Sequence, residues 1–221
     1  MKVLAIIPAR AGSKRLKNKN RLTLGGEPLV NWSVKFALKT KFINDIIIST
    51  DDNKIIQYYK NNSKVKVFKR PRILSGSKIK TIKVLYDVIK KYEKTNIKIN
   101  TIILLQATSP FRSNKKINTA FRSYKNFKMK RSIVSVSKSI KKERRSFIIL
   151  NRSLKISKKN SKKQKYQMNG NFYIASKNFL KKNKSFFHDK NTVPIILNSK
   201  RLNVDIDTKK EYIMAKKFLK K

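Results

Sequence analysis

The chain has 221 residues and no cysteine, and its 57 lysine and arginine residues face only 11 aspartate and glutamate residues, giving a formal net charge of +46. The lack of cysteine excludes disulfide bonds, thiolate metal sites and cysteine nucleophiles. Because 39% of the residues are hydrophobic, wholesale disorder is excluded and we expect a single folded domain over residues 1–221.

The positive charge by itself favours nucleic acid or an anionic surface as partner. Its make-up argues against specific nucleic-acid binding, because lysine outnumbers arginine 45 to 12 and bidentate recognition favours arginine. The lysines are also scattered over almost every segment. The apolar runs are too short for a signal peptide or a membrane span. We therefore expect a cytoplasmic protein with no specific nucleic-acid partner and no membrane insertion.

In chain order, apolar runs alternate with amphipathic segments, which predicts βαβ units and a mainly parallel sheet flanked by helices. The run Val3–Ile7 is typical of a buried parallel strand. The same reasoning predicts further strands at 46–50, 65–68, 102–106, 132–137, 171–175 and 193–197. Helices are expected at 28–40, 52–61, 79–94 and 113–127, after Ser176, and from Thr208 onward. The expected fold class is α/β.

Residues 140–168 follow a different pattern. Two short apolar runs, 147–150 and 154–156, flank Asn151-Arg152-Ser153, and a very basic polar stretch follows. The pattern predicts a hairpin arm with a flexible tip. The arm has too little apolar mass to form a domain, so we expect it to pack on another surface.

The loop after the first strand carries Gly12, Ser13 and several cations. Such a loop is how α/β folds present backbone N–H groups and ammonium groups to phosphate oxygens. It is neither of the two commonest phosphate loops, because the chain has no G-x-x-x-x-G-K-[ST] and no G-x-G-x-x-G after this strand. The alternative interpretation is a solvated basic turn.

Two carboxylates, Asp205 and Asp207, lie near the C-terminus on either side of Ile206. In an extended segment alternate residues share a face, so both carboxylates are expected to point the same way. Two hard oxygen ligands suit Mg²⁺ that already bridges phosphate groups. The alternative is that Asp207 only caps the helix that begins at Thr208.

The amino-terminal string resembles a known signature. Ile7-Pro8-Ala9-Arg10-Ala11-Gly12-Ser13-Lys14, with Lys19-Asn20 after it, is similar to the nucleotide-binding loop of the acylneuraminate cytidylyltransferases, which make CMP-activated sialic acids. Further motifs resemble that family in order: Ser49-Thr50-Asp51, Arg70-Pro71, Leu104 to Arg112, Asn169 to Tyr173, and Val204 to Thr208. The resemblance implies a Rossmann-like fold and a homodimer in which the hairpin arm reaches across to the neighbouring subunit.

The resemblance implies transfer of CMP from CTP to the anomeric hydroxyl of a nine-carbon 2-keto sugar acid, with release of pyrophosphate and with Mg²⁺ as cofactor. Catalysis would fall to Arg10, Lys19 and Asp207, and Mg²⁺ binding to Asp205 and Asp207. The nucleotide would contact Ala9, Arg10, Ala11, Gly12, Ser13, Lys19, Asn20 and Arg70. The sugar acid would contact Gln106, Asn169 and Tyr173.

The chain departs from the family pattern at Ser77, where members usually have an aspartate at the start of the next helix; we expect Ser77 to cap that helix instead. N-acetylneuraminic, legionaminic and pseudaminic acids all remain open as substrates. Two alternatives from other classes also remain: an inactive relative that only binds nucleotide, and a basic nucleic-acid-binding protein.

Overall fold

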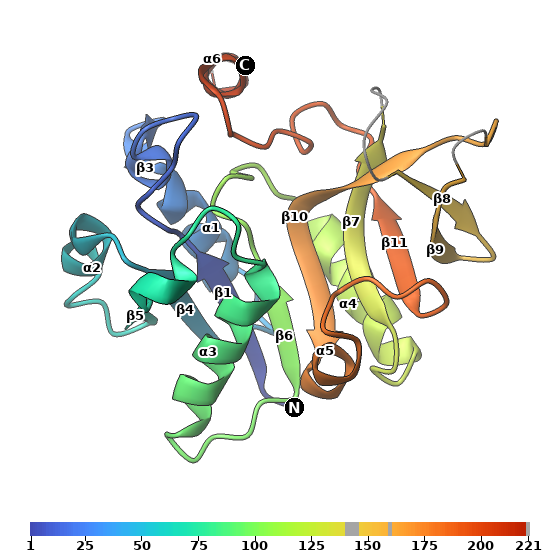
Figure 1. The fold of residues 1–221 in the computed structure, drawn as a ribbon, viewed down its shortest axis with the longest axis horizontal. Helices are drawn as coiled ribbons and strands as arrows, with labels where there is room; N and C mark the ends of the chain where they lie inside the picture. Colours follow the sequence, from blue (N-terminus) through green and yellow to red (C-terminus); the bar gives the residue numbers. More distant parts are fainter. Residues whose placement is uncertain (140–145, 159–160, 220–221) are drawn as a thin grey trace.

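The computed structural model describes residues 1–139, 146–158 and 161–219 (Figure 1). Its main sheet runs in the order β11-β7-β10-β6-β1-β4-β5. Those strands are β1 (Val3–Pro8), β4 (Asp45–Thr50), β5 (Val65–Lys69), β6 (Thr101–Leu104), β7 (Ser132–Lys138), β10 (Tyr166–Ser176) and β11 (Thr192–Ile196). Strand β10 is antiparallel to both of its neighbours in this order, whereas the other pairs are parallel. The predicted mainly parallel α/β sheet is confirmed.

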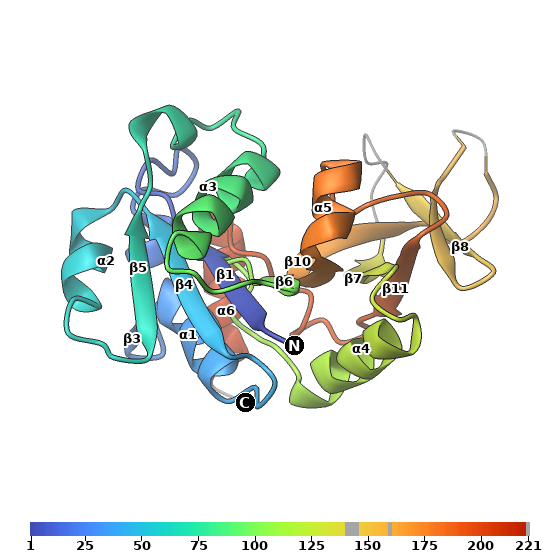
Figure 2. The ribbon, with the colours of Figure 1, turned by 90° about the horizontal axis from the view of Figure 1, so that it is seen from below.

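Helices cover both faces of this sheet (Figure 2). Helices α3 (Thr81–Glu93) and α5 (Lys177–Asn183) lie on one face, and α1 (Leu29–Leu38) and α4 (Asn114–Asn126) on the other. The short α2 (Asn53–Tyr58) packs at the β4–β5 end of the sheet. This two-sided cover explains the continuous apolar run of β1, because alternate side chains point to opposite cores. Val3, Ala5 and Ile7 lie in the core beneath α1 and α4.

The predicted hairpin arm is present as β8 (Phe147–Leu150) and β9 (Ser153–Ile156). Its turn places Asn151 and Arg152 at φ 48° and 57°, which matches the twist of a two-residue hairpin. Phe147 pairs with Tyr166, so the hairpin extends the sheet of its own chain. The sequence interpretation ended the arm at residue 168, but β10 already begins at Tyr166. Residues 140–145 and 159–160 of the predicted arm lie outside the described residues.

The sequence interpretation missed a two-stranded hairpin, β2 (Thr23–Leu24) and β3 (Glu27–Pro28), because its strands are too short to show a period. Two 3₁₀ turns, η1 (Lys19–Arg21) and η2 (Arg72–Leu74), were missed for the same reason. Gly25 and Gly26 form the hairpin turn at φ 59° and 82°, a backbone region that favours glycine.

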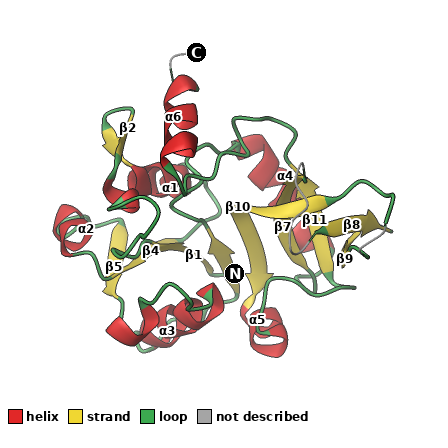
Figure 3. Cartoon of the chain, turned by 45° about the horizontal axis from the view of Figure 1, so that its top comes forward, coloured by secondary structure: helices red, strands yellow, loops and turns green. Residues whose placement is uncertain are grey.

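The C-terminal segment crosses back over the β2–β3 hairpin and α1, and ends in α6 (Lys209–Lys217) (Figure 3). Residues 204–207 join no sheet, but the Ile206 N–H donates to the carbonyl oxygen of Thr108 at 2.8 Å. Val204 and Ile206 are buried with Leu24 and Leu29. The C-terminal segment is therefore anchored on the β2–β3 hairpin, the start of α1 and the loop after β6. In the described part of the chain, no helix has the length and apolar character needed to cross a membrane.

Candidate functional site

The candidate site lies at the edge of the sheet where β1, β4 and β6 end, which is where open α/β sheets bind ligands. A cavity of about 140 Å³ opens there. Its lining comes from the loop after β1, the end of β5, the segment before α3 and the loop after β6. Six residues predicted from the sequence lie in this lining: Arg10, Ser13, Lys19, Asn20, Arg70 and Gln106.

The loop after β1 is held by its neighbours. Asp51 accepts a hydrogen bond from the Ala11 N–H at 2.8 Å, and the buried Asn20 amide donates to the Arg10 carbonyl at 2.9 Å. The Ser13 N–H donates to the carbonyl of Ala11. Of the backbone N–H groups of Ala11, Gly12 and Ser13 in the predicted phosphate loop, those of Ala11 and Ser13 thus already donate hydrogen bonds within the protein. Gly12 keeps a free N–H in the described structure, and its carbonyl accepts from the Arg10 guanidinium.

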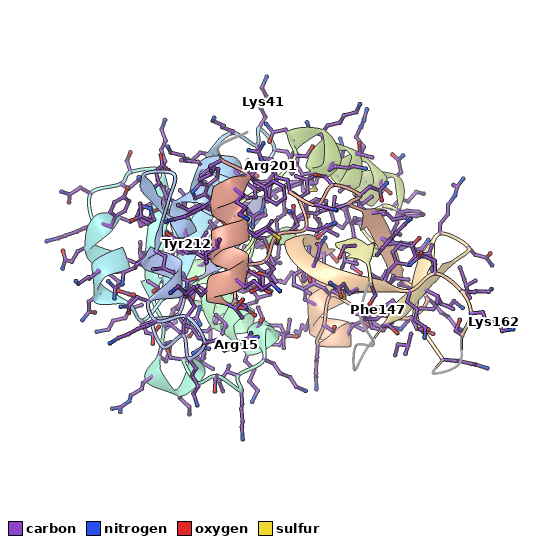
Figure 4. The ribbon with its side chains drawn as sticks, turned by 90° about the horizontal axis from the view of Figure 1, so that it is seen from above. Arg15, Lys41, Phe147, Lys162, Arg201 and Tyr212 are labelled. Atoms are coloured by element: carbon purple, nitrogen blue, oxygen red, sulfur yellow. The ribbon has the colours of Figure 1, made fainter. Side chains whose placement is uncertain are left out.

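The carboxylate of Asp207 forms ion pairs with both Lys19 and Arg15 (Figure 4 labels Arg15 near one end of α6). The Lys19 side chain is only 14% exposed, whereas that of Arg15 is 67% exposed. These pairs join the two ends of the chain, 188 residues apart for Lys19 and Asp207. They hold the pKa of Asp207 below its usual value, although burial opposes this.

The interpretation of Asp207 as a helix cap is wrong. Thr208 is the N-cap of α6 and forms a reciprocal capping box with Glu211, whose carboxylate also accepts the Asp207 N–H at 2.8 Å. The Asp207 carboxylate is therefore left to face the cations of the amino-terminal loop.

Asp205 lies deeper than Asp207, and its Oδ1 is buried without a hydrogen-bond partner among the described residues. Burial raises the pKa of Asp205, and the neighbouring Asp207 adds to this effect, while Thr108 and Lys19 oppose it. An orphaned buried carboxylate oxygen costs free energy unless a cation or a proton satisfies it. The described residues contain no cluster of three or more metal-ligating side chains. A pair of carboxylates nevertheless fits Mg²⁺, which commonly takes one or two carboxylates and completes its shell with phosphate oxygens and water.

Arg70 is buried at 5% exposure beside the end of β4. Its guanidinium donates to the carbonyl oxygen of Ser49 at 2.7 Å and to the Ser49 hydroxyl at 3.3 Å. Burial lowers the pKa of Arg70 to about 10; nearby Arg10 adds to this effect and Asp51 opposes it. The structure thus brings Arg70 and Arg10 to one cavity.

Of the three residues predicted at the sugar acid, only Gln106 lines the cavity. Asn169 is buried behind it, and its amide accepts from Ser135 at 2.6 Å and donates to Asn203 at 3.0 Å. Tyr173 is also buried, and its hydroxyl accepts the Gly170 N–H at 2.9 Å. Asn169 and Tyr173 therefore support the strand bulge at Gly170, while Phe172 is an ordinary core residue.

Arg112 was quoted within a motif but received no predicted role. Its guanidinium donates to the carbonyl oxygens of Gln106 and Asn171, both at 2.7 Å, and to the Ser33 hydroxyl at 2.9 Å. Burial lowers the pKa of Arg112 to about 9, and Asp205 opposes this shift. Arg112 thus ties the loop after β6 to β10 and α1.

The sequence interpretation also missed the segment before α3. Ser77 was expected to cap this helix, but α3 begins at Thr81 with Lys80 at the N-cap, and Ser77 lines the cavity instead. Ile79 and Thr81 line it as well. The glycine and serines before α3 signalled a loop, but nothing in their pattern showed that it turns toward the site. Arg15 was missed because one more cation in a lysine-rich loop carries no distinguishing signal.

Comparisons with known proteins show the family and the fold of the chain. The profile of a family described as Cytidylyltransferase matches residues 4–220. The chain is 31% identical to a CMP-N,N'-diacetyllegionaminic acid synthase of Legionella pneumophila, over 99% of this chain and 97% of that protein. It is 30% identical to an N-acylneuraminate cytidylyltransferase of Escherichia coli, over 97% of this chain but 51% of that protein. The fold resembles that of a CMP:2-keto-3-deoxy-manno-octonic acid synthetase complexed with CTP, with a TM-score of 0.77 at 15% identity, covering 100% of this chain and 99% of the other.

Proposed function

Since the chain belongs to the cytidylyltransferase family, and is thus a nucleotidyltransferase, we propose that it transfers CMP from CTP to the anomeric hydroxyl of a nine-carbon 2-keto sugar acid. The single observation that supports this most directly is the ion pairing of Lys19 and Arg15 with Asp207. It brings the cations that a triphosphate needs into contact with a carboxylate that a metal needs, beside the cavity that Lys19 lines and from distant parts of the chain.

In the proposed reaction the anomeric hydroxyl oxygen attacks the α-phosphorus of CTP. A new P–O bond to the sugar forms, the P–O bond to the β-phosphate breaks, and pyrophosphate leaves with the bridging oxygen. We assign no described side chain of the cavity as the proton acceptor. The hydroxyl proton therefore passes to solvent. Such a transfer needs mainly positioning and neutralisation of charge.

The cations of the amino-terminal loop carry this neutralisation. Lys19 and Arg10 line the cavity, and we assign them to the triphosphate, with Lys19 near the departing pyrophosphate. Binding of the triphosphate would draw Lys19 and Arg15 away from Asp207 and onto the phosphates. The free Gly12 N–H adds one backbone donor. Ala9, Ala11, Ser13, Asn20 and Arg70 would shape the rest of the nucleotide site.

Asp205 and Asp207 are the residues that would hold Mg²⁺, which when bound would neutralise phosphate charge and polarise the phosphoryl oxygens. The fit rests on the two carboxylates and on the unsatisfied Oδ1 of Asp205. Lys19 and Arg15 pair with the same Asp207 carboxylate, so the cations and the proposed metal ligand lie together.

We assign the sugar acid to the side of the cavity that Gln106 lines. Asn169 and Tyr173 would act on it through the bulge at Gly170, which lies against the Gln106 side chain. A substrate of the legionaminic acid type is supported by the similarity to the Legionella synthase over nearly its whole length. The hairpin arm would complete the site of a second subunit in a homodimer. A fully active monomer in sedimentation experiments would overturn the dimer proposal.

The test is release of pyrophosphate from CTP and Mg²⁺ in the presence of legionaminic, pseudaminic and N-acetylneuraminic acids, with ATP, GTP and UTP as controls. We expect turnover only with CTP and with at least one of these acids. Binding of CTP without turnover across the panel would instead favour an inactive relative. Salt-resistant, sequence-specific DNA binding without turnover would favour the nucleic-acid alternative.

A further inference from the structure

A second cavity opens at the opposite edge of the sheet, between the turn that follows α4 and helix α5. Its volume is about 660 Å³, against about 140 Å³ at the candidate site. A volume of several hundred Å³ is typical of pockets that hold small organic molecules. The cavity lies beside Asn100 and Ser176, at the start of β6 and the end of β10, so it is a separate feature from the cavity near Gln106.

The charge of this cavity has one sign. Lys128, Lys130, Lys177 and Lys182 line it, and no carboxylate does. Lys177 pairs with Glu93, which lies outside the lining. Within the described residues the other three lysines form no salt bridge. The cavity thus holds ammonium groups whose charge the protein does not neutralise, which favours an anionic ligand.

The rest of the lining combines neutral polar groups with apolar ones. Four asparagines contribute side-chain amides: Asn100, Asn178, Asn183 and Asn191. The Asn100 amide oxygen already accepts from the Lys2 N–H, and the Asn183 amide already donates to the Phe179 carbonyl oxygen. Met129 adds apolar surface, whereas Ile99 and Phe179 are buried behind the lining at 4% and 6% exposure. A purely inorganic anion would leave this apolar surface in contact with water. The lining therefore suits a ligand with a charged end and an organic body.

The turn that carries two of the lysines has an unusual backbone. Lys128 and Met129 follow each other in the left-handed region, at φ 49° and 58°. The Met129 N–H donates to the carbonyl oxygen of Tyr124 at 3.1 Å, so this turn is the C-terminal cap of α4. Here the conformation turns the chain sharply after α4, so that residues 128–130 form one wall of the cavity.

We propose that this second cavity binds a phosphorylated organic molecule of nucleotide size. Lysine ammonium groups bind phosphate oxygens as point charges, the asparagine amides orient the polar parts of the body, and Met129 packs against its apolar part. The site is distinct from the transfer site, so the proposal stands or falls independently of the proposed reaction.

The test is calorimetric titration of the full chain with ATP at about 0.15 M NaCl, where interactions between exposed charges are screened beyond roughly 8 Å. The substitution Lys19→Ala is used to remove nucleotide binding at the candidate site, so that the titration measures binding at other sites only. In that background we expect one saturable site per chain. The added pair Lys128→Glu and Lys182→Glu should weaken binding at least tenfold.

A matched control adds Lys60→Glu and Lys64→Glu instead, the same change of charge at exposed lysines between α2 and β5. It should alter affinity less than twofold. An equal loss of ATP affinity in the two double variants would overturn the proposal, because charge alone would then explain the binding. The absence of a saturable site in the Lys19→Ala background would overturn it as well, because the candidate site would then explain the binding.

Two further measurements do not depend on the folding of a variant. ATP should slow amide hydrogen exchange in residues 128–130 and 177–183 of the wild-type chain; slowing confined to the loop of residues 9–20 would contradict the proposal. Inorganic triphosphate and adenosine separate the two halves of the probe. We expect ATP to bind at least fivefold more tightly than either one, whereas inorganic triphosphate equal to ATP would rule out an organic body.

Discussion

The two edges of the sheet are both rich in lysine and arginine, yet they differ in where carboxylates lie. At the edge where β1 and β6 end, Asp207 contacts Lys19 and Arg15, and Asp205 keeps a buried oxygen unsatisfied. At the opposite edge, the second cavity is lined by lysines without a carboxylate. In a chain with 11 acidic residues among 221, the carboxylates and not the lysines distinguish a site that can hold a metal from one that can only attract an anion.

The largest effect should come from removing a carboxylate at the first edge. We expect Asp207→Ala to lower pyrophosphate release by about 10³-fold or more, because it removes a proposed Mg²⁺ ligand and leaves Lys19 and Arg15 without their partner. Binding of ATP at the second cavity should not change. Glu27→Ala, which removes a partly exposed carboxylate paired with Lys35, is the matched control. Activity of Asp207→Ala within tenfold of wild type would contradict the metal assignment.

Lys19→Ala should have the next largest effect. If Lys19 stabilises charge on the departing pyrophosphate, kcat should fall on the order of 10²-fold, with a smaller change in KM for CTP. Lys17→Ala removes an exposed cation from the same loop and should retain nearly full activity. A change in KM alone would show that Lys19 contributes only to ground-state binding. Steady-state kinetics of pyrophosphate release separate these cases.

Gly170→Ala tests how the strand bulge positions the sugar side of the first edge. Gly170 has φ +71°, and a Cβ there would lie 3.1 Å from Cγ of Gln106. We expect a loss of about 1–2 kcal/mol in the free energy of unfolding and a rise on the order of tenfold in KM for the sugar acid.

Gly26→Ala is the control for this substitution. It imposes a similar strain at φ +82°, where a Cβ would meet no atom within 4 Å. The Gly26→Ala variant should lose a similar free energy of unfolding but keep the wild-type KM for the sugar acid. An equal rise in KM for both variants would show that the effect on the sugar site comes from general destabilisation.

The smallest effect is expected near the opposite edge, where Asp45 is hydrogen-bonded to Tyr92 at 2.6 Å and paired with Lys2. Burial alone would raise the pKa of Asp45, but Lys2 and Tyr92 outweigh it and the pKa lies below its usual value. The resulting stabilisation is present above the usual pKa and is lost as the pH falls through the lower one.

Thermal melts between about pH 6 and pH 3 test this linkage. We expect the Tm of Asp45→Asn to fall less steeply over this range than that of wild type, with activity at neutral pH unchanged. Parallel Tm curves would show that this cluster does not couple stability to protonation.

The sequence alone predicted most of the fold because its signals are local. The two-sided burial of β1 follows from the continuous apolar run at Val3–Ile7, and the amphipathic helices and the hairpin at Asn151 and Arg152 were predicted close to their observed bounds. The short β2–β3 hairpin and the start of α3 were missed, because a two-residue strand has no period and Ser77 could cap a helix as well as line a cavity.

The candidate site was predicted only as a set of residue types. Motifs pointed to Lys19, Gln106 and Asp207, but a motif does not show which side chains reach the ligand. The structure places Gln106 in the lining and Asn169 and Tyr173 behind it. It also adds Arg15 and Arg112, whose roles depend on partners far away in the chain.

The sequence by itself determined the helices and strands, the family resemblance and the excess of positive charge, since each depends only on neighbouring residues or on composition. Only the tertiary structure decided that the Ile206 N–H joins the Thr108 carbonyl, which brings Asp207 to Lys19. It also decided that the turn after α4 and helix α5 line a second cationic cavity. Contacts between residues far apart in sequence form only when the core packs, and no local pattern encodes which distant groups will meet.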